Sequence, residues 1–396
     1  MTTAETTPTT SPGHPATEMD ARGAGSTARE IAQQPALWRQ VGHDVSARRA
    51  LTEAFLGPLL AKPDLRIVLT GAGTSAFAGE LLATTLEREL GRRVDAIATT
   101  DLVSSPREHF AVDAPTLLVS FARSGDSPES LAATQLADRC LNECHHLIVT
   151  CNPDGELYRS HSAEDRSLVL TMPDGANDRG FAMTSSFTCM VLSVLLMLGR
   201  RTSDATDVEA LAAAGERVLA AGDPWCRELA ARGYERIVYL GSGPLTALAR
   251  ESALKTLELT AGRVATWFDS PLGFRHGPKS VVDSRTLVVI YLSNDPYTRR
   301  YDEDMLSELR EALPGGAVLA VGGRASDDPA FENTQLVTGA EDVEDVAASL
   351  TFVLVAQLLA LHLSLELGMA PDNPFPDKQV NRVVQGVTIH PLPRRG

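Results

Sequence analysis

The sequence predicts an α/β fold made of two tandem three-layer αβα domains with parallel sheets, followed by a C-terminal tail that docks. Short apolar runs alternate with stretches of helical length from about residue 64 onward, and strands that alternate with helices form parallel sheets covered on both faces. The chain also repeats itself, because RIVLTGAG at residues 66–73 is matched by RIVYLGSG at residues 236–243, 170 residues further along. A chain of 396 residues fits two domains of roughly 100–200 residues each.

In the first half, strands are expected at residues 66–70, 94–99, 116–121, 146–151 and 168–171. Helices are expected at residues 75–90, 128–139 and 183–198. The first of these is amphipathic and ends at Gly91, and the second begins with Pro128 at its first position. The strand at 146–151 is closed by the turn Asn152-Pro153-Asp154-Gly155.

A polar, Ala-rich helix near residues 208–221 leads into the second half. Strands are expected there at residues 236–240, 264–268, 286–292 and 317–321, and helices at 244–261, 301–313 and 343–367. The predicted domains are residues 45–205 and 213–370. Residues 1–25, rich in Thr, Pro, Ala and Gly, are expected to be disordered. Residues 371–396 form the Pro-rich tail, expected to dock through its apolar residues, which are Val380, Val383, Val384, Val387 and Ile389.

The composition argues against several classes of binding partner and against a membrane span. A net charge of -15 opposes binding to nucleic acid or to anionic lipid. No signal peptide is evident, and the apolar run at 350–367 is interrupted by Gln357, His362 and Glu366, which predicts a buried helix rather than a membrane span. Five cysteines scattered through apolar segments indicate reduced thiols, so we expect a cytoplasmic protein.

One cysteine pair raises the question of a metal. Cys140 and Cys144 are four residues apart in a probable helix, and His145 and His146 follow directly. A zinc site would need a second ligand pair at suitable spacing, and none follows. We therefore expect no metal site.

The first Gly-x-Gly loop is the phosphate candidate. A strand, a Gly-rich loop and a helix present free backbone N–H groups and the positive end of a helix dipole at one point. In the first copy Gly73 is followed by the hydroxyls of Thr74 and Ser75, whereas the second copy continues with Pro244 and Leu245. The second loop is therefore expected to have kept the turn and lost the ligand.

A dinucleotide is the alternative for such a loop. The third glycine position of that fingerprint holds Ala76, which is sometimes tolerated. The acid at the end of the next strand is Asp101, some thirty residues after the glycines and later than the ~20 expected for a ribose-binding acid. This spacing disfavours NAD.

A second polar loop follows the strand at 116–121, with Arg123, Ser124 and Gly125 in the bend and Ser127 before the helix at Pro128. These residues could simply cap that helix. Two hydroxyl-rich turns at the carboxyl ends of two parallel strands favour a ligand instead, because such sheets bind their ligands there.

Acid–base candidates lie on the helix after Gly243. At 100° per residue, Glu251, Lys255 and Glu258 fall within a sector of ~60°. A solvated ion-pair ladder would have the same spacing, but flanking leucines favour a cavity wall. The loop at 269–279 adds His276 between Arg275 and Lys279, two cations expected to lower its pKa and leave it neutral.

These motifs resemble the sugar isomerase (SIS) domain family, and most closely its AgaS branch, from about residue 45 to the end of the chain. The motifs that carry the resemblance are GAGTS at 71–75, RSGDSPES at 123–130, NDRGFAMTSSFT at 177–188, RESALK at 250–255, GFRHGPKS at 273–280 and NRVVQGV at 381–387. The architecture also resembles the isomerase half of glucosamine-6-phosphate synthase.

The resemblance implies roles for individual residues. Thr74, Ser75, Ser124 and Ser127 would hold the phosphate, and the phosphosugar-binding set would also include Gly73, Arg123, Thr184 and Ser185. Glu258 would shuttle a proton between C2 and C1, with Glu251 and Lys255 lining the pocket. His276 would help open the sugar ring from the neighbouring subunit of a homodimer.

The implied reaction converts a hexosamine 6-phosphate, expected to be galactosamine 6-phosphate, to a ketose 6-phosphate and ammonia, without metal or organic cofactor. The synthase's Schiff-base lysine corresponds to Gln385 here, and the glutaminase domain is absent, so neither protein-imine catalysis nor ammonia from glutamine is expected. Plain aldose–ketose isomerisation and a non-catalytic sugar-phosphate sensor are the alternatives. No motif distinguishes a galacto from a gluco substrate.

Overall fold

The computed structural model describes residues 9–11, 14–199, 206–313, 315–325, 334–377, 379–384 and 386–393. It divides into two compact units. Unit 1 comprises Met1–Arg39, Asp178–Ser185 and Thr206–Pro376, and unit 2 comprises Gln40–Asn177, Ser186–Ala205 and Asp377–Gly396. Gln385, parts of the predicted disordered segment (1–8 and 12–13), the end of the first predicted domain (200–205) and the last tail residues (394–396) lie outside the described residues.

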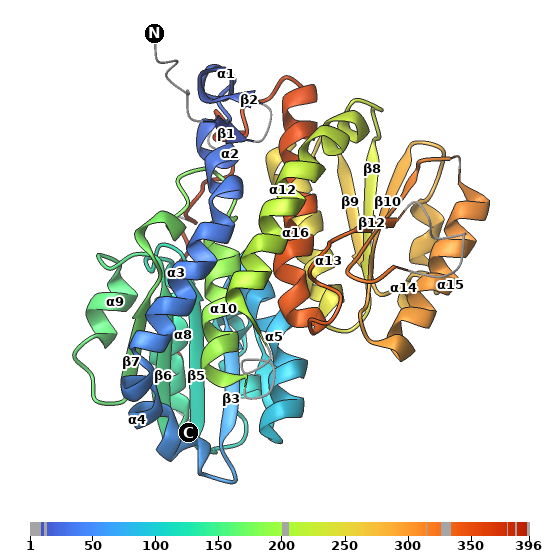
Figure 1. The fold of residues 1–396 in the computed structure, drawn as a ribbon. Helices are drawn as coiled ribbons and strands as arrows, with labels where there is room; N and C mark the ends of the chain where they lie inside the picture. Colours follow the sequence, from blue (N-terminus) through green and yellow to red (C-terminus); the bar gives the residue numbers. More distant parts are fainter. Residues whose placement is uncertain are drawn as a thin grey trace, which may run out of the picture. The chain divides into compact units, whose positions relative to one another are not determined.

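Unit 2 is built on a five-stranded parallel sheet in the order β4-β3-β5-β6-β7 (Figure 1). Its strands are β3 (Arg66–Thr70), β4 (Val94–Ala96), β5 (Thr116–Ala122), β6 (Cys144–Thr150) and β7 (Ser167–Thr171). The connecting helices are α5 (Thr74–Leu90), α6 (Thr99–Ser104), α7 (Pro106–His109), α8 (Pro128–Cys140) and α9 (Glu156–His161), with α4 (Arg49–Leu60) before them. Residues of β3 and β5 pack against α6 and α8 in a buried cluster that contains Val68, Leu102, Leu118, Ala133 and Ala137. Parallel strands buried on both faces read as continuous apolar runs, which is why RIVLT predicted β3 correctly.

Unit 1 repeats this architecture. Its parallel sheet has the order β12-β11-β10-β8-β9, from β8 (Arg236–Gly241), β9 (Ala265–Asp269), β10 (Thr286–Leu292), β11 (Val318–Gly322) and β12 (Thr334–Leu336). Its helices include α12 (Val208–Ala230), α13 (Pro244–Leu259), α14 (Pro271–Phe274), α15 (Pro296–Ala312) and α16 (Asp345–Glu366). Numbered within each unit, both sheets have the strand order 2-1-3-4-5, which confirms the duplication seen in the sequence.

The helix α16 passes the length and composition test for a membrane span, but its apolar stretch is fully buried inside the protein. Two of the polar residues that interrupt it have partners there. Gln34 Nε2 donates to Gln357 Oε1 at 2.6 Å, and His362 Nε2 lies 2.8 Å from Asp223 Oδ1. The prediction of a buried helix is confirmed, because paired polar groups are tolerated in a core.

Part of the predicted disordered segment is folded, so this prediction was wrong for residues 16–25. Helix α1 (Ala16–Ala21) precedes α2 (Gly25–Ala32) and α3 (Gln34–Ala47), and Met19 and Ala24 are fully buried. Asp372 accepts hydrogen bonds from the backbone N–H groups of Ser26 and Thr27 at 3.0 and 2.7 Å. The local composition is poor in apolar residues, and distant parts of unit 1 supply the contacts instead.

The tail docks, but by a different means from the one expected. Arg107 donates to the carbonyl oxygen of Pro393 at 2.6 Å, and Arg123 donates to that of Arg382 at 2.9 Å. Most of its apolar side chains are at least a third exposed: Val380, Val384, Val387 and Ile389. Arginine side chains of unit 2 therefore hold the tail through its backbone.

Candidate functional site

The first Gly-x-Gly loop lies at the topological switch point of unit 2. In a sheet of order 2-1-3-4-5, ligands bind where the first and third strands diverge, outside their carboxyl ends. These strands are β3 and β5, and the two loops singled out from the sequence, at 71–75 and 123–127, follow them. The topology therefore brings Gly73, Thr74, Ser75, Arg123, Ser124 and Ser127 to one edge of one sheet.

Two glycines shape the first loop. A Cβ at Gly71 would lie 2.5 Å from the backbone of Ser75, and Gly73 has φ 55° and ψ −128° before the first turn of α5, a conformation that favours glycine. Thr74 and Ser75 are 3% and 5% exposed. Their side chains lie at the start of α5, directly after β3, and the N-terminus of a helix after a Gly-rich loop is a position at which anions bind.

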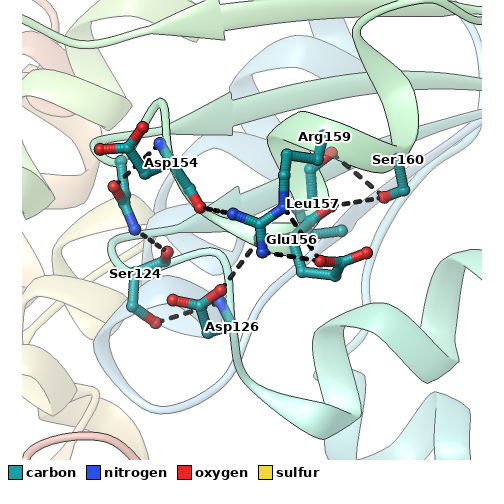
Figure 2. Close-up of polar contacts among 8 residues, drawn as sticks. Ser124, Asp126, Asp154, Glu156, Leu157, Arg159 and Ser160 are labelled. Atoms are coloured by element: carbon teal, nitrogen blue, oxygen red, sulfur yellow. Dashed lines mark hydrogen bonds and ion pairs between the residues drawn. The ribbon is translucent and has the colours of Figure 1, made fainter.

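The second loop is hydrogen-bonded to the turn after β6 and to the start of α9, as Figure 2 shows. Asn152 Nδ2 donates to the carbonyl oxygen of Ser124 at 2.8 Å, and the N–H of Glu156 donates to Asp126 Oδ1 at 2.9 Å. A Cβ at Gly155 would lie 2.5 Å from the carbonyl oxygen of Ser124, so the turn can approach only with glycine there. The sequence reasoning missed this support, although the turn itself was predicted.

Ser127 is the N-cap residue of α8, but its hydroxyl does not cap the helix in the described structure. It donates instead to Glu129 Oε2 at 2.9 Å. Arg123 is only 6% exposed, and its guanidinium brings a positive charge to this edge of the sheet. Helix capping therefore does not explain Ser127, and the loop combines a cation with hydroxyl donors, as anion recognition requires.

The second copy of the loop is occupied by the protein's own carboxylates. Gly243 has φ 57° and ψ −129°, which matches Gly73 closely. Ser242 Oγ donates to Asp302 Oδ1 at 2.5 Å, and the N–H of Ser293 donates to Asp302 Oδ2 at 2.9 Å. Burial raises the pKa of Asp302 to about 7.

A second carboxylate, that of Asp345, accepts from a backbone donor at the end of β10. The N–H of Asn294, at the end of β10, donates to Asp345 Oδ1 at 2.7 Å. The donors that follow β8 and β10 are thus used by Asp302 and Asp345, which leaves these donors unavailable to an anionic ligand. These contacts agree with the expectation that the second copy kept the turn and lost the ligand.

The acid–base candidates form a buried triad on α13. Lys255 Nζ lies 2.6 Å from Glu258 Oε2 and 3.4 Å from Glu251 Oε1. The side chains of Lys255 and Glu251 have no exposed surface, whereas that of Glu258 is 26% exposed. Burial alone would lower the pKa of Lys255, but the charges of Glu251 and Glu258 outweigh it and raise that pKa. The triad is therefore not a solvated ladder, and Glu258 is its accessible member.

His276 is exposed on the loop after α14. The two cations expected beside it form ion pairs with Glu308, from Arg275 at 2.9 Å and from Lys279. Glu308 therefore offsets one of the two positive charges that were expected to act on His276.

Two residues predicted to bind phosphate, Thr184 and Ser185, form hydrogen bonds with other groups of the protein. Thr184 and Ser185 have no exposed surface, and their backbone N–H groups donate to Asp178 at 2.8 and 3.0 Å. The Thr184 hydroxyl donates to Asp178, and that of Ser185 donates to the carbonyl oxygen of Glu30 at 2.6 Å. A phosphate has no access to these two hydroxyls in this structure, which is a correction to the prediction.

The structure thus groups the candidates into two sets. The phosphate set lies in unit 2, and Glu251, Lys255, Glu258 and His276 lie in unit 1 together with Thr184 and Ser185.

The comparisons with known proteins agree with this architecture. The SIS domain model matches residues 59–200. A Streptomyces coelicolor protein provisionally named D-galactosamine-6-phosphate deaminase AgaS is 58% identical over 368 residues, 92% of this chain and 95% of that protein. The D-galactosamine-6-phosphate deaminase AgaS of Shewanella sp. (strain ANA-3) is 44% identical and covers 93% of each chain. The crystal structure of tagatose-6-phosphate ketose/aldose isomerase from Escherichia coli matches with TM-score 0.85 and 42% identity, over 92% of this chain and 97% of that chain.

Proposed function

Because the chain belongs to the AgaS branch of the SIS domain family, we propose that it is an enzyme that converts D-galactosamine 6-phosphate to a ketose 6-phosphate and ammonia. The observation that carries this is similarity to the AgaS deaminases over more than nine-tenths of both chains. The shared length includes the switch-point loops of unit 2 and the triad on α13. A phosphate site and a buried acid–base group are the two parts that this reaction needs.

Phosphate binding is the first step. The hydroxyls of Thr74, Ser75, Ser124 and Ser127 would donate to the phosphate dianion, with Ser127 turning away from Glu129. Arg123 would balance part of its charge. Asp302 and Asp345 hold the equivalent donors of unit 1, so we place the phosphate group on unit 2.

Proton transfer is the second step. After ring opening, Glu258 would remove the C2 proton and return it at C1, while Lys255 stabilises the developing enediol charge and holds Glu258 at 2.6 Å. A 2-amino aldose becomes a 2-imino ketose by this transfer. Water then adds to the imine carbon, and loss of ammonia leaves the ketose. No net oxidation occurs.

Ring opening would involve His276 from the partner copy of a homodimer. Exposed apolar side chains occur on α13, β9 and α14 of unit 1, namely Leu257, Trp267, Phe268 and Leu272, and α14 leads into the His276 loop. A dimer interface that covers this part of unit 1 would remove these side chains from water. We also propose a cytoplasmic location, which agrees with five cysteines that form no disulfide bond.

A complementation experiment tests the dimeric site. His276→Ala and Glu258→Gln protomers, inactive alone, are mixed under exchange conditions. If His276 acts across the interface, each mixed dimer holds one intact site, and activity returns to about a quarter of wild type. No recovery in dimers shown to be mixed would contradict a shared site.

An ammonia-release assay on hexosamine phosphates tests the reaction. Ammonia from galactosamine 6-phosphate is expected. Turnover of tagatose 6-phosphate without ammonia would favour plain isomerisation, a candidate supported by the Escherichia coli structure at 42% identity. Sugar-phosphate binding without any turnover would favour a sensor.

A further inference from the structure

A group of potential metal ligands lies in unit 2, at the end of α8 and the start of β6, away from the loops that the proposed reaction uses. The ligand atoms of Asp138, Cys144 and His146 all lie within 4.8 Å of one another. Asp138 is in the last turn of α8, and Cys144 and His146 are the first and third residues of β6, so they share one face of the sheet. The sequence had suggested Cys140 and Cys144 on one helix, but Cys140 ends α8 and Cys144 begins β6.

The cluster is far from the phosphate loops. Cys144 and His146 are in register with Thr116 and Leu118, at the start of β5, whereas Arg123 follows the end of that strand. At about 3.3 Å per residue, the two sites are separated by about 20 Å along the sheet. Metal binding here would therefore leave the substrate-binding edge untouched.

Burial and hydrogen bonding single out His146. It is 3% exposed, and Cys144 is 2% exposed. His146 Nε2 lies 2.8 Å from Asp138 Oδ1, so this ring nitrogen faces the carboxylate of the cluster. A cation bound here would take the Nε2 lone pair in place of that contact.

A polar cavity of about 680 Å³ adjoins the cluster and is also lined by His161, Glu164, Asp165 and Arg166. His161 Nδ1 lies 2.9 Å from Ser167 Oγ. The cavity has room for water beside the ligands.

We propose that Asp138, Cys144 and His146 bind one Zn²⁺ ion, with water from the adjoining cavity as fourth ligand. Sulfur, nitrogen and oxygen donors in a four-coordinate set are typical of zinc. On binding, the Cys144 thiol releases its proton to solvent. The thiolate and the carboxylate then balance the two positive charges, so the buried complex has no net charge.

The geometry needs only a small adjustment. Zinc–ligand bonds of about 2.0–2.3 Å place tetrahedral ligands roughly 3.3–3.6 Å apart. The side chain of Asp138 is 56% exposed at the end of α8, so it can rotate toward the ion without disturbing the sheet.

Cobalt substitution tests this site in the full-length, tag-free protein. We expect one Co²⁺ per chain, with a thiolate-to-cobalt charge-transfer band in the near ultraviolet. Cys144→Ser should abolish the band and weaken binding at least tenfold, and Asp138→Asn, on the surface, should weaken it by a similar factor. Cys140→Ser, four residues earlier, is the matched control and should keep both band and affinity. Absence of the band in the wild type, its survival in Cys144→Ser, or its loss in Cys140→Ser would overturn the proposal.

X-ray absorption of the zinc-loaded wild type gives a test that needs no variant. One sulfur at about 2.3 Å with nitrogen and oxygen at about 2.0–2.2 Å is expected. A shell with no sulfur, or with two, would overturn the assignment.

Discussion

The buried triad on α13 gives a sharp test of how charge is held in unit 1. Replacing Lys255 with Met keeps the length of the side chain and removes the cation that lies 3.4 Å from Glu251 and 2.6 Å from Glu258. Glu251 has no exposed surface, so water cannot replace the lost charge. Glu258 is 26% exposed and can regain hydration. The loss of stability should therefore come mainly from the uncompensated charge of Glu251.

Coulomb's law sets the scale. Unit charges 3.4 Å apart attract by about 5 kcal/mol at an effective dielectric constant of about 20. Desolvation offsets much of this in the intact pair, but removing one partner leaves only the cost, which is about 3–5 kcal/mol for buried pairs. Lys255→Met should lower the free energy of unfolding of unit 1 by that amount.

Urea denaturation followed by circular dichroism measures this loss. The double variant Lys255→Met, Glu251→Gln removes the buried charge as well, and should recover about 2 kcal/mol of the deficit. Arg285→Met, which breaks an exposed ion pair with Glu235 in unit 1, is the control and should cost less than about 1 kcal/mol. Two results would contradict this reasoning. Lys255→Met could lower the free energy of unfolding no more than the control does, or the added Glu251→Gln could lower it further. In either case Lys255 and Glu251 would not be a buried charge pair.

Three further outcomes are expected. Glu258→Gln should lower kcat about 10²–10⁴-fold with little change in KM; an unchanged kcat would exclude Glu258 as the proton shuttle. Ser75→Ala should raise KM about tenfold by removing one phosphate donor. Ser242→Ala, in the second Gly-x-Gly loop, is the control and should leave KM unchanged. Equal effects of the two variants would contradict the assignment of the phosphate to unit 2. Burial and the nearby charge of Asp178 raise the pKa of Glu30 from 4.5 to about 7. Its protonated form stabilises the native state fully below pH 4.5, and this stability, on the order of 3 kcal/mol, is lost as the pH rises to 7. Glu30→Gln should therefore make the free energy of unfolding less dependent on pH between 4.5 and 7. An unchanged pH profile in this variant would refute the raised pKa.

Much of the fold was predictable, because its signals are local. Strands buried on both faces are continuous apolar runs, so β3, β8 and β10 were predicted within a residue of their observed ends. Short elements were not found: α6, α7 and β12 have only three to six residues each, too few to show a period. The N-terminal helices were missed because contacts distant in sequence, such as those of Asp372 with Ser26 and Thr27, stabilise them.

The sequence by itself determined the duplication and the αβα architecture, and it predicted the phosphate loop, because a strand, two glycines and the residues that follow are contiguous. Only the tertiary structure showed what holds Thr184 and Ser185. Their hydroxyls donate to Asp178 and to the carbonyl oxygen of Glu30. Likewise Asp302 reaches Ser242 from 60 residues away along the chain. Whether a hydrogen-bond donor already has a partner within the protein depends on long-range packing, which no short motif encodes.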